Sequence, residues 1–348
     1  MLYYIIPYIH ILFFTLYFYK KYKFRNEFYN LLVFLILPAF LIVVLRGNVG
    51  TDTHTYLNFF RNYKLNGFSN ITFEPGFEFL GWFFSLISLN ERVSIALIST
   101  ATTFILCKLF SHSREEMLIF GLILFPIYYV DFTMNALRYG LAFTFSAVAI
   151  DELYNKKYRK TLLFAVIALL FHYSSVLVIV PFLMNYLKKK YWVLIVLSVG
   201  SFILLFPNLF DQLMFYLDSK EYAYSLFYSP TTFSGAAPMI LTLLLYFNFI
   251  INTKKKDHVA LIHLILLAEI GSFIIARFSY AGLRLQSAFL FAMIIFLKNN
   301  WQYINYKKRN AEILLLISFI AFSIFLKNVS SDTSGESPFS PYTFFWEQ

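Results

Sequence analysis

Residues 117–150, MLIFGLILFPIYYVDFTMNALRYGLAFTFSAVAI, decide how this chain must fold. The stretch is apolar almost throughout, and its strongly polar residues, Asp131, Asn135 and Arg138, lie close together near the middle. At about 1.5 Å per residue a single helix would run for about 50 Å, well beyond the roughly 30 Å hydrocarbon core of a bilayer. The stretch therefore predicts two membrane spans, with the turn between Asp131 and Arg138.

The composition of the whole chain also indicates a membrane protein. Of its 348 residues, 59% are hydrophobic and 14% are charged, and there are 44 Phe and 26 Tyr. An ordinary soluble domain has roughly 25% charged residues, so no soluble fold could hide this much apolar surface. We expect an all-α integral membrane protein, because helices satisfy their own backbone hydrogen bonds in lipid.

Apolar stretches near the roughly 20 residues that a spanning helix needs occur along the rest of the chain. They predict spans at 2–19, 28–45, 92–110, 190–206, 236–252, 259–276, 285–298 and 310–327. With the two spans in 117–150 this gives about ten full spans in one membrane domain, residues 1–327. Residues 328–348 form a polar tail, which we expect to be mobile.

Short lysine runs set the expected orientation. They lie between apolar stretches, which is the pattern of cytoplasmic loops, at Lys20-Lys21, Lys156-Lys157, Lys188-Lys189-Lys190, Lys254-Lys255-Lys256 and Lys307-Lys308. Both termini, the tail and two large loops, residues 46–75 and 207–235, are then outside. The net charge of +10 is spread over these runs instead of one basic face, so we expect no nucleic-acid partner.

Two segments do not fit a simple span. Residues 77–89 follow Glu74-Pro75-Gly76 and are too few to cross, so we expect an interfacial or re-entrant piece. Residues 161–187 lie between two lysine runs, and one crossing would put the second run outside. Two half-helices that meet near residues 172–175 keep both runs inside, which membranes accept only where the break is buried or lines a wet cavity.

Arginines gather on the side where basic residues should be scarce. The outer set consists of Arg46, Arg61, Arg138, Arg277 and Arg284, whereas the inner charges are mostly lysines. Arginine presents a planar fork of donors that suits phosphate oxygens, and it keeps its charge when partly desolvated. The set indicates a bound phosphate or pyrophosphate; the alternative is that these side chains reach lipid headgroups.

Three further ionisable residues are candidates for chemistry. Asp52 lies in the polar loop 46–56, where it could bind sugar hydroxyls or orient a base, although an Asx-turn would give a similar composition. His172 lies in the broken stretch, and a neutral imidazole can take a proton from a hydroxyl; the alternative is a histidine bonded to a nearby carbonyl. Glu269 is a second ionisable group in an apolar stretch, with a polar partner expected on an adjacent helix.

Several motifs are absent from the sequence. It has no Walker loop, no Cys/His spacing of a zinc site, no Gly-x-Ser-x-Gly elbow and no Asp-x-Asp pair. This argues against an ATP-driven machine, a metalloprotease and a metal- and sugar-nucleotide-dependent transferase. We therefore expect neither a metal nor another cofactor.

Four short motifs, in order between about residues 46 and 185, resemble the EpsG-like branch of the Wzy-type polysaccharide polymerases. They are Arg46-x-x-x-Gly-Thr-Asp-Thr-x-x-Tyr56, Glu74-Pro-Gly-Phe, Arg138-Tyr-Gly-Leu-Ala and Phe171-His-Tyr-Ser-Ser. The later half of the chain matches only as a pattern of spans with an outer arginine.

The resemblance implies a GT-C-like membrane glycosyltransferase in the bacterial inner membrane, with its active site facing the periplasm. Such enzymes join oligosaccharide repeat units carried on undecaprenyl diphosphate, transferring the growing chain onto the sugar end of the incoming unit. His172 or Asp52 would be catalytic. Substrate binding would fall to Arg46, Arg138, Glu74 and Tyr56, and, from the topology alone, to Arg277 and Arg284.

The expected partners are the lipid-linked donor and acceptor, membrane lipids, a flippase and a chain-length regulator. Two other functions remain open. An O-antigen ligase would transfer the glycan to lipid A core, and such enzymes usually have a larger outer loop than residues 207–235. A lipid-linked sugar flippase would need a cationic pathway that reaches both faces, whereas these arginines lie toward one.

Overall fold

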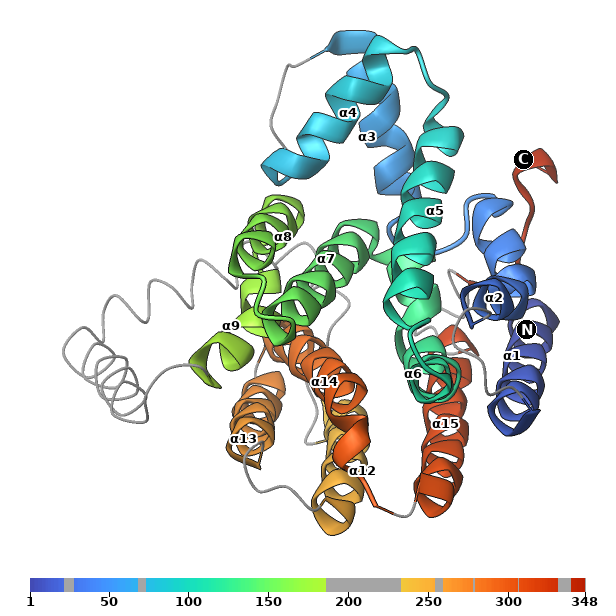
Figure 1. Cartoon of the computed structure of the whole chain (residues 1–348). Coiled ribbons are helices and arrows are strands. Elements are labelled where there is room, and N and C mark those ends of the chain that lie inside the picture. Colours follow the sequence, from blue (N-terminus) through green and yellow to red (C-terminus); the bar gives the residue numbers. More distant parts are fainter. Residues whose placement is uncertain are drawn as a thin grey trace. The chain divides into compact units, whose positions relative to one another are not determined.

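The computed structural model describes residues 1–21, 28–67, 73–185, 233–253, 259–277, 279–305, 307–330 and 339–347. Within them the regular structure is helical and contains no strand, which confirms the all-α expectation; an isolated bridge joins Arg46 and Phe344. The helices shown in Figure 1 are α1 Leu2–Lys21, α2 Phe28–Val44, α3 Thr53–Asn66, α4 Pro75–Leu86, α5 Glu91–Leu109, α6 Arg114–Ile119, η2 Phe120–Tyr129, η3 Asp131–Asn135, α7 Leu137–Tyr154, α8 Tyr158–Phe171, α9 Ser175–Asn185, α12 Ala236–Asn252, α13 Val259–Ala276, α14 Tyr280–Asn300 and α15 Lys307–Ser330.

The chain forms two compact units. The first consists of Met1–Val176 together with Leu297–Gln348, and the second of Leu177–Phe296. The first unit contains α1 to α8 and α15, whereas α12, α13 and most of α14 belong to the second. All four sequence motifs lie in the first unit.

Among the described residues, five helices are long and apolar enough to cross a membrane: Leu2–Lys21, Glu91–Leu109, Val259–Ala276, Tyr280–Tyr303 and Arg309–Ser330. Each coincides with a predicted span. The predicted spans 28–45 and 236–252 are shorter apolar helices. The span 190–206 and most of the loop 207–235 lie outside the described residues. The chain is a multi-pass membrane protein.

The turn predicted within residues 117–150 is confirmed. α6, η2 and η3 follow one another as far as Asn135, and η2 and η3 have the wider turns of a π-helix. At Ala136 the backbone leaves the helical region (φ −92°, ψ 63°), and α7 begins at the next residue. A Cβ at Gly140 would collide with the carbonyl oxygen of Phe132, so the first turn of α7 packs directly on η3.

Residues 46–75, expected to be a loop, contain the helix α3. Its apolar residues follow helical spacing, and the aromatic rings of Tyr56, Phe59 and Phe60 pack around Phe77 of α4. The 12 residues of α4 are too few to cross a bilayer, as expected for 77–89. α3 and α4 therefore form a helix pair with an aromatic core.

The break predicted near residues 172–175 is also confirmed. α8 ends at Phe171, His172 is extended (φ −163°, ψ 125°), and α9 begins at Ser175. α8 has 14 residues, too few to span, and α9 has 11 within the described residues. That the chain returns to the inner side stays a prediction, because Lys188-Lys189-Lys190 lie outside the described residues.

The expectation of a mobile tail is wrong for residues 339–347. Main-chain hydrogen bonds join Gly47 N to Thr343 O at 2.8 Å and Phe345 N to Leu45 O at 3.0 Å. The Tyr342 hydroxyl donates to Ile42 O at 2.6 Å. The end of the chain thus packs on the C-terminal end of α2 through backbone pairing, which a hydropathy pattern does not reveal.

The contact between η3 and α7 should make Gly140 intolerant of any side chain. Gly140→Ala should lower the unfolding free energy by about 1–3 kcal/mol through overpacking, measured as a lower melting temperature of the purified protein. Gly271→Ala is the matched control, since a Cβ there meets nothing within 4 Å, and it should leave the melting temperature unchanged or raise it. Equal melting temperatures for the two variants would contradict the packing described.

Candidate functional site

The side chain of Arg138, on the first turn of α7, lies at the centre of a cluster of polar and aromatic groups. Its Nη1 donates to Glu74 Oε2, and its guanidinium carbon lies 4.1 Å from the centroid of the Phe73 ring. The Tyr56 hydroxyl also lies near the guanidinium and interacts with it. The Arg138 side chain is 23% exposed and that of Glu74 11%, so this ion pair is partly dehydrated yet reachable from outside.

Glu74 stands just before α4, and its position follows from the local sequence. Pro75 fixes the first helical residue of α4, and the Glu74 backbone is extended (φ −68°, ψ 152°). Its carboxylate does not cap the helix, which leaves both oxygens for other groups. At Gly76 a Cβ would lie 2.8 Å from the Leu170 carbonyl oxygen. That close approach of α4 to α8 brings Glu74 to the end of α8.

His172 lies at that end of α8, facing Glu74. Its Nε2 is 3.8 Å from Glu74 Oε1, beyond hydrogen-bond length, and its ring packs edge-to-face on Tyr139 with centroids 5.4 Å apart. Its Nδ1 accepts from the Ser174 backbone N–H at 3.2 Å and lies 2.7 Å from Ser174 Oγ. The backbone donor requires a lone pair on Nδ1, so we assign the proton of the neutral ring to Nε2, toward Glu74.

Asp52 lies close to this cluster but is held by a different set of groups. Its backbone N–H donates to Asn135 Oδ1 at 3.3 Å, and Thr51 Oγ1 donates to the same atom. Asn135 in turn donates to Asp131 Oδ1 at 3.1 Å. Asp52 thereby joins the start of α3 to the end of η3.

Tyr56 belongs to the Arg138 cluster as a neutral phenol. Burial raises the pKa of its hydroxyl above the ordinary value, and the nearby Arg138 charge opposes this shift. The hydroxyl therefore serves as a hydrogen-bonding group and not as an anion at neutral pH.

Arg46 occupies a separate place at the end of α2 and is only 5% exposed. Its Nη1 donates to Val43 O at 2.9 Å and to Thr133 O at 2.8 Å. Its Nε and Nη2 are buried and have no hydrogen-bond partner in the described part of the chain. Burial lowers the pKa of Arg46 to about 10, so the side chain stays cationic at neutral pH.

The remaining arginines of the outer set each have contacts of their own. Arg277 and Arg284 belong to the second unit, and both are exposed, with aromatic contacts to Phe273 at 4.6 Å and Tyr280 at 5.1 Å. Arg61 forms a surface ion pair with Glu91 at 3.0 Å. Of the residues singled out from the sequence, the structure thus brings together Arg138, Glu74, Tyr56 and His172.

Three groups of the cluster were given no role from the sequence: Phe73, Tyr139 and Ser174. Tyr139 and Ser174 lie within the quoted motifs and Phe73 precedes one, and that position was the available signal. No group of three or more His, Cys, Asp or Glu side chains that could hold a metal occurs in the described ranges.

The helices and this cluster define a multi-pass membrane protein with a partly buried arginine, carboxylate and imidazole at one end of its first unit. Residues 29–344 match the model of the EpsG family, so the chain belongs to the EpsG family. This makes it a membrane protein of polysaccharide biosynthesis, similar at a coarse level to glycosyltransferase-like polymerases. No curated protein and no solved structure matches the chain.

Replacing Arg138 by Lys would keep the charge but remove the fork that contacts Glu74 and Tyr56 together. In a deletion strain complemented with the variant, surface polysaccharide should fall about tenfold or more at normal protein level, since hydrogen bonds to charged groups contribute about 1.5–3 kcal/mol. Arg61→Lys is the matched control and should give wild-type output. Full output from Arg138→Lys would mean that the fork has no role.

Proposed function

We propose that this chain polymerises undecaprenyl-diphosphate-linked oligosaccharide repeat units into O-antigen or a related surface polysaccharide. It acts as a metal-independent, GT-C-like glycosyltransferase with about ten spans, and its site faces the periplasm from the bacterial inner membrane. The observation that carries the proposal is the meeting of Arg138, Glu74 and His172 in a member of the EpsG family. The arginine suits a diphosphate, and the other two groups suit proton transfer.

The reaction is a displacement at the anomeric carbon of the growing chain. The acceptor hydroxyl oxygen bonds to that carbon while the bond from the carbon to the diphosphate oxygen breaks. Undecaprenyl diphosphate leaves with the electron pair, and Arg138 stabilises the charge that builds on it. The acceptor proton goes to His172. Holding both carriers side by side supplies the contribution of proximity.

His172 can accept this proton at Nε2 only in the tautomer that carries its hydrogen on Nδ1. That tautomer gives up the hydrogen bond from the Ser174 backbone N–H to Nδ1, and the Ser174 hydroxyl, 2.7 Å from Nδ1, then accepts the Nδ1 hydrogen. Glu74 Oε1, at 3.8 Å from Nε2, then stabilises the imidazolium that forms. A diphosphate bound to Arg138 competes with Glu74 for the guanidinium, which frees the carboxylate to turn to His172.

Asp52 is the alternative base. Its main-chain link to Asn135 places its carboxylate near Tyr56, whose phenol responds to the Asp52 charge. Asp52 becomes the better candidate for the base if polymerisation persists when His172 is replaced by a residue that cannot accept a proton.

The sharpest test is a deletion strain that is complemented with His172 variants and scored by the banding of its surface glycan. His172→Ala should abolish the ladder while single repeats remain, because general-base catalysis is worth about 10²–10⁴ in rate. His172→Gln preserves hydrogen bonds without a proton acceptor and should fail equally at normal protein level.

Ser174→Ala is the companion variant, since it removes only the hydroxyl that stabilises the reactive tautomer. We expect a shortened ladder, not a lost one. A full ladder with His172→Gln would show that His172 is not the general base and would favour Asp52 in that role. Loss of all attached glycan from the deletion strain, single repeats included, would indicate a ligase and contradict polymerisation.

A further inference from the structure

A cavity of about 290 Å³ opens beside Arg46, and Thr53 and Leu57 of α3 line part of it. Its charged lining consists of Arg46 and Arg92, and none of the described residues that line it is acidic. Gly47 and Thr53 also line it, but the Gly47 N–H already donates to Thr343 O and the Thr53 hydroxyl to Val49 O, and the other lining residues are apolar. The volume lies near the lower end of the roughly 300–1,000 Å³ of small-ligand sites.

The buried positive charge of Arg46 would be stabilised by a bound anion. Its Nη1 is anchored by Val43 O and Thr133 O, whereas Nε and Nη2 have no partner among the described residues. The groups that raise its pKa against burial are the phenols of Tyr342, Tyr4 and Tyr56, none of them a carboxylate. Since removing a cation from water costs several kcal/mol unless an anion compensates, a ligand phosphate would satisfy this guanidinium.

The walls of the cavity suit a phosphate that carries a hydrocarbon chain. Val43 and Val44 come from the last turn of the apolar helix α2, and Val93 and Ala96 from the first turns of α5. These helix ends lie where a span meets the aqueous layer. An arginine pair beside such walls matches a charged head with the first units of its lipid tail.

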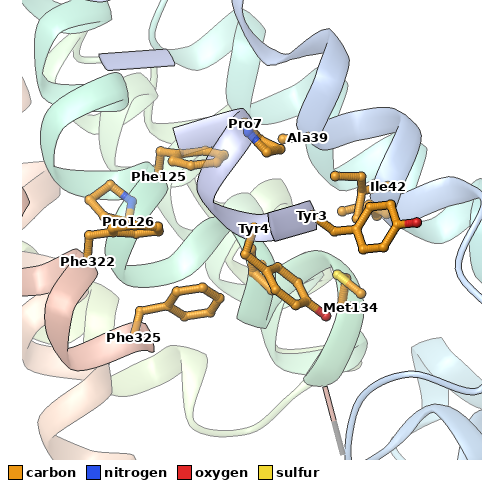
Figure 2. Close-up of a pocket in the computed structure, with 12 residues that line it drawn as sticks. Tyr3, Tyr4, Pro7, Ala39, Ile42, Phe125, Pro126, Met134, Phe322 and Phe325 are labelled. Atoms are coloured by element: carbon orange, nitrogen blue, oxygen red, sulfur yellow. The ribbon is translucent and has the colours of Figure 1, made fainter. Parts of the chain in front are cut away.

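The neighbouring apolar pocket differs in both size and chemistry. Figure 2 shows Tyr4, Phe125, Phe322 and Phe325 around it, and its volume of about 20 Å³ leaves room for roughly one water molecule. That pocket is a packing gap, and the ligand-sized space is the one beside Arg46.

The first turns of α3 contribute to both arginine sites. Tyr56 contacts Arg138, whereas Thr53 and Leu57 line the Arg46 cavity. We infer that the Arg46–Arg92 cavity binds the phosphate head of a second lipid-linked substrate, while the Arg138 cluster holds the first. The inference rests on the proposed function, in which two lipid diphosphates must be present together, and it gives each its own cationic site.

The end of the chain forms one wall of this cavity. Phe345 lines it, and two backbone hydrogen bonds, from Phe345 N to Leu45 O and from Gly47 N to Thr343 O, hold the segment 343–345 in place. The packed tail therefore has a role in shaping the second site.

The test counts lipid diphosphates bound to the purified full-length protein in nanodiscs of phosphatidylcholine, with radiolabelled undecaprenyl diphosphate as the probe. Wild type should bind two equivalents. Arg46→Gln and Arg138→Gln should each lose one, with that site weakened about tenfold to hundredfold. A single equivalent that Arg46→Gln leaves intact would overturn the inference.

Ala96→Phe tests the cavity without touching the anchoring bonds of Arg46. It fills the apolar part of the cavity and should remove the same equivalent as Arg46→Gln, whereas Leu97→Phe, on the exposed face of α5, should remove none. Two equivalents bound by Ala96→Phe would contradict a site in this cavity.

A phospholipid offers the same phosphate chemistry, so the nanodiscs are also made with phosphatidylglycerol. The second equivalent should persist at equal amounts of the two lipids; its displacement would make the cavity a general lipid site and overturn the inference. Binding counts do not need turnover. One equivalent with intact polymerisation would refute this inference alone, and two equivalents without polymerisation would refute the proposed function alone.

Discussion

The pairing of Arg138 with Glu74 positions the helices at one end of the first unit. It joins the first turn of α7 to the residue before α4, and the aromatic core of the α3–α4 pair packs around that junction. A partly buried ion pair of this kind adds little net stability, because dehydration of the charges offsets their attraction. Its more direct effect is positional: it fixes where a carboxylate stands relative to His172 and where a guanidinium meets an incoming anion.

The opposite end of α7 is fixed by a second pair. Lys298 Nζ lies 2.5 Å from Asp151 Oδ2 and 3.8 Å from Glu116, and the Lys298 side chain is only 2% exposed. Asn299 donates to the other oxygen of Asp151 at 3.0 Å. Because α7 is tied at both ends and packs on η3 through Gly140, its first turn provides a rigid support for Arg138.

Much of this arrangement could be predicted from the sequence where polar residues interrupt apolar runs. The turn after Asn135 follows from an apolar stretch too long for one span, and the break at His172 follows from the lysine runs on both sides of residues 161–187. The order of the four motifs also brought Glu74, Arg138 and His172 to notice. Their assembly depends on the close contact of Gly76 with Leu170, which involves residues far apart in the chain.

Other features depend on contacts that no local pattern reveals. In the sequence α3 looked like a polar loop, although Tyr56, Phe59, Phe60 and Tyr63 follow helical spacing. The partner that buries these side chains, α4, is not evident from the sequence of α3. In the sequence Arg46 and Arg138 were equivalent candidates for substrate binding. In the structure Arg46 donates to the Thr133 carbonyl of η3, whereas Arg138 pairs with Glu74. The tail packs through main-chain hydrogen bonds, which leave no trace in its composition.

The central claim is that the Arg138 cluster performs glycosyl transfer between two lipid-linked repeats. The most direct measurement is made on proteoliposomes that contain the purified chain and a synthetic undecaprenyl-diphosphate-linked repeat, with no nucleotide sugar added. We predict that one undecaprenyl diphosphate is released for each linkage formed, and that Glu74→Gln forms linkages at least about tenfold more slowly. Movement of the intact repeat across the bilayer without diphosphate release, or an unchanged rate in Glu74→Gln, would contradict the account.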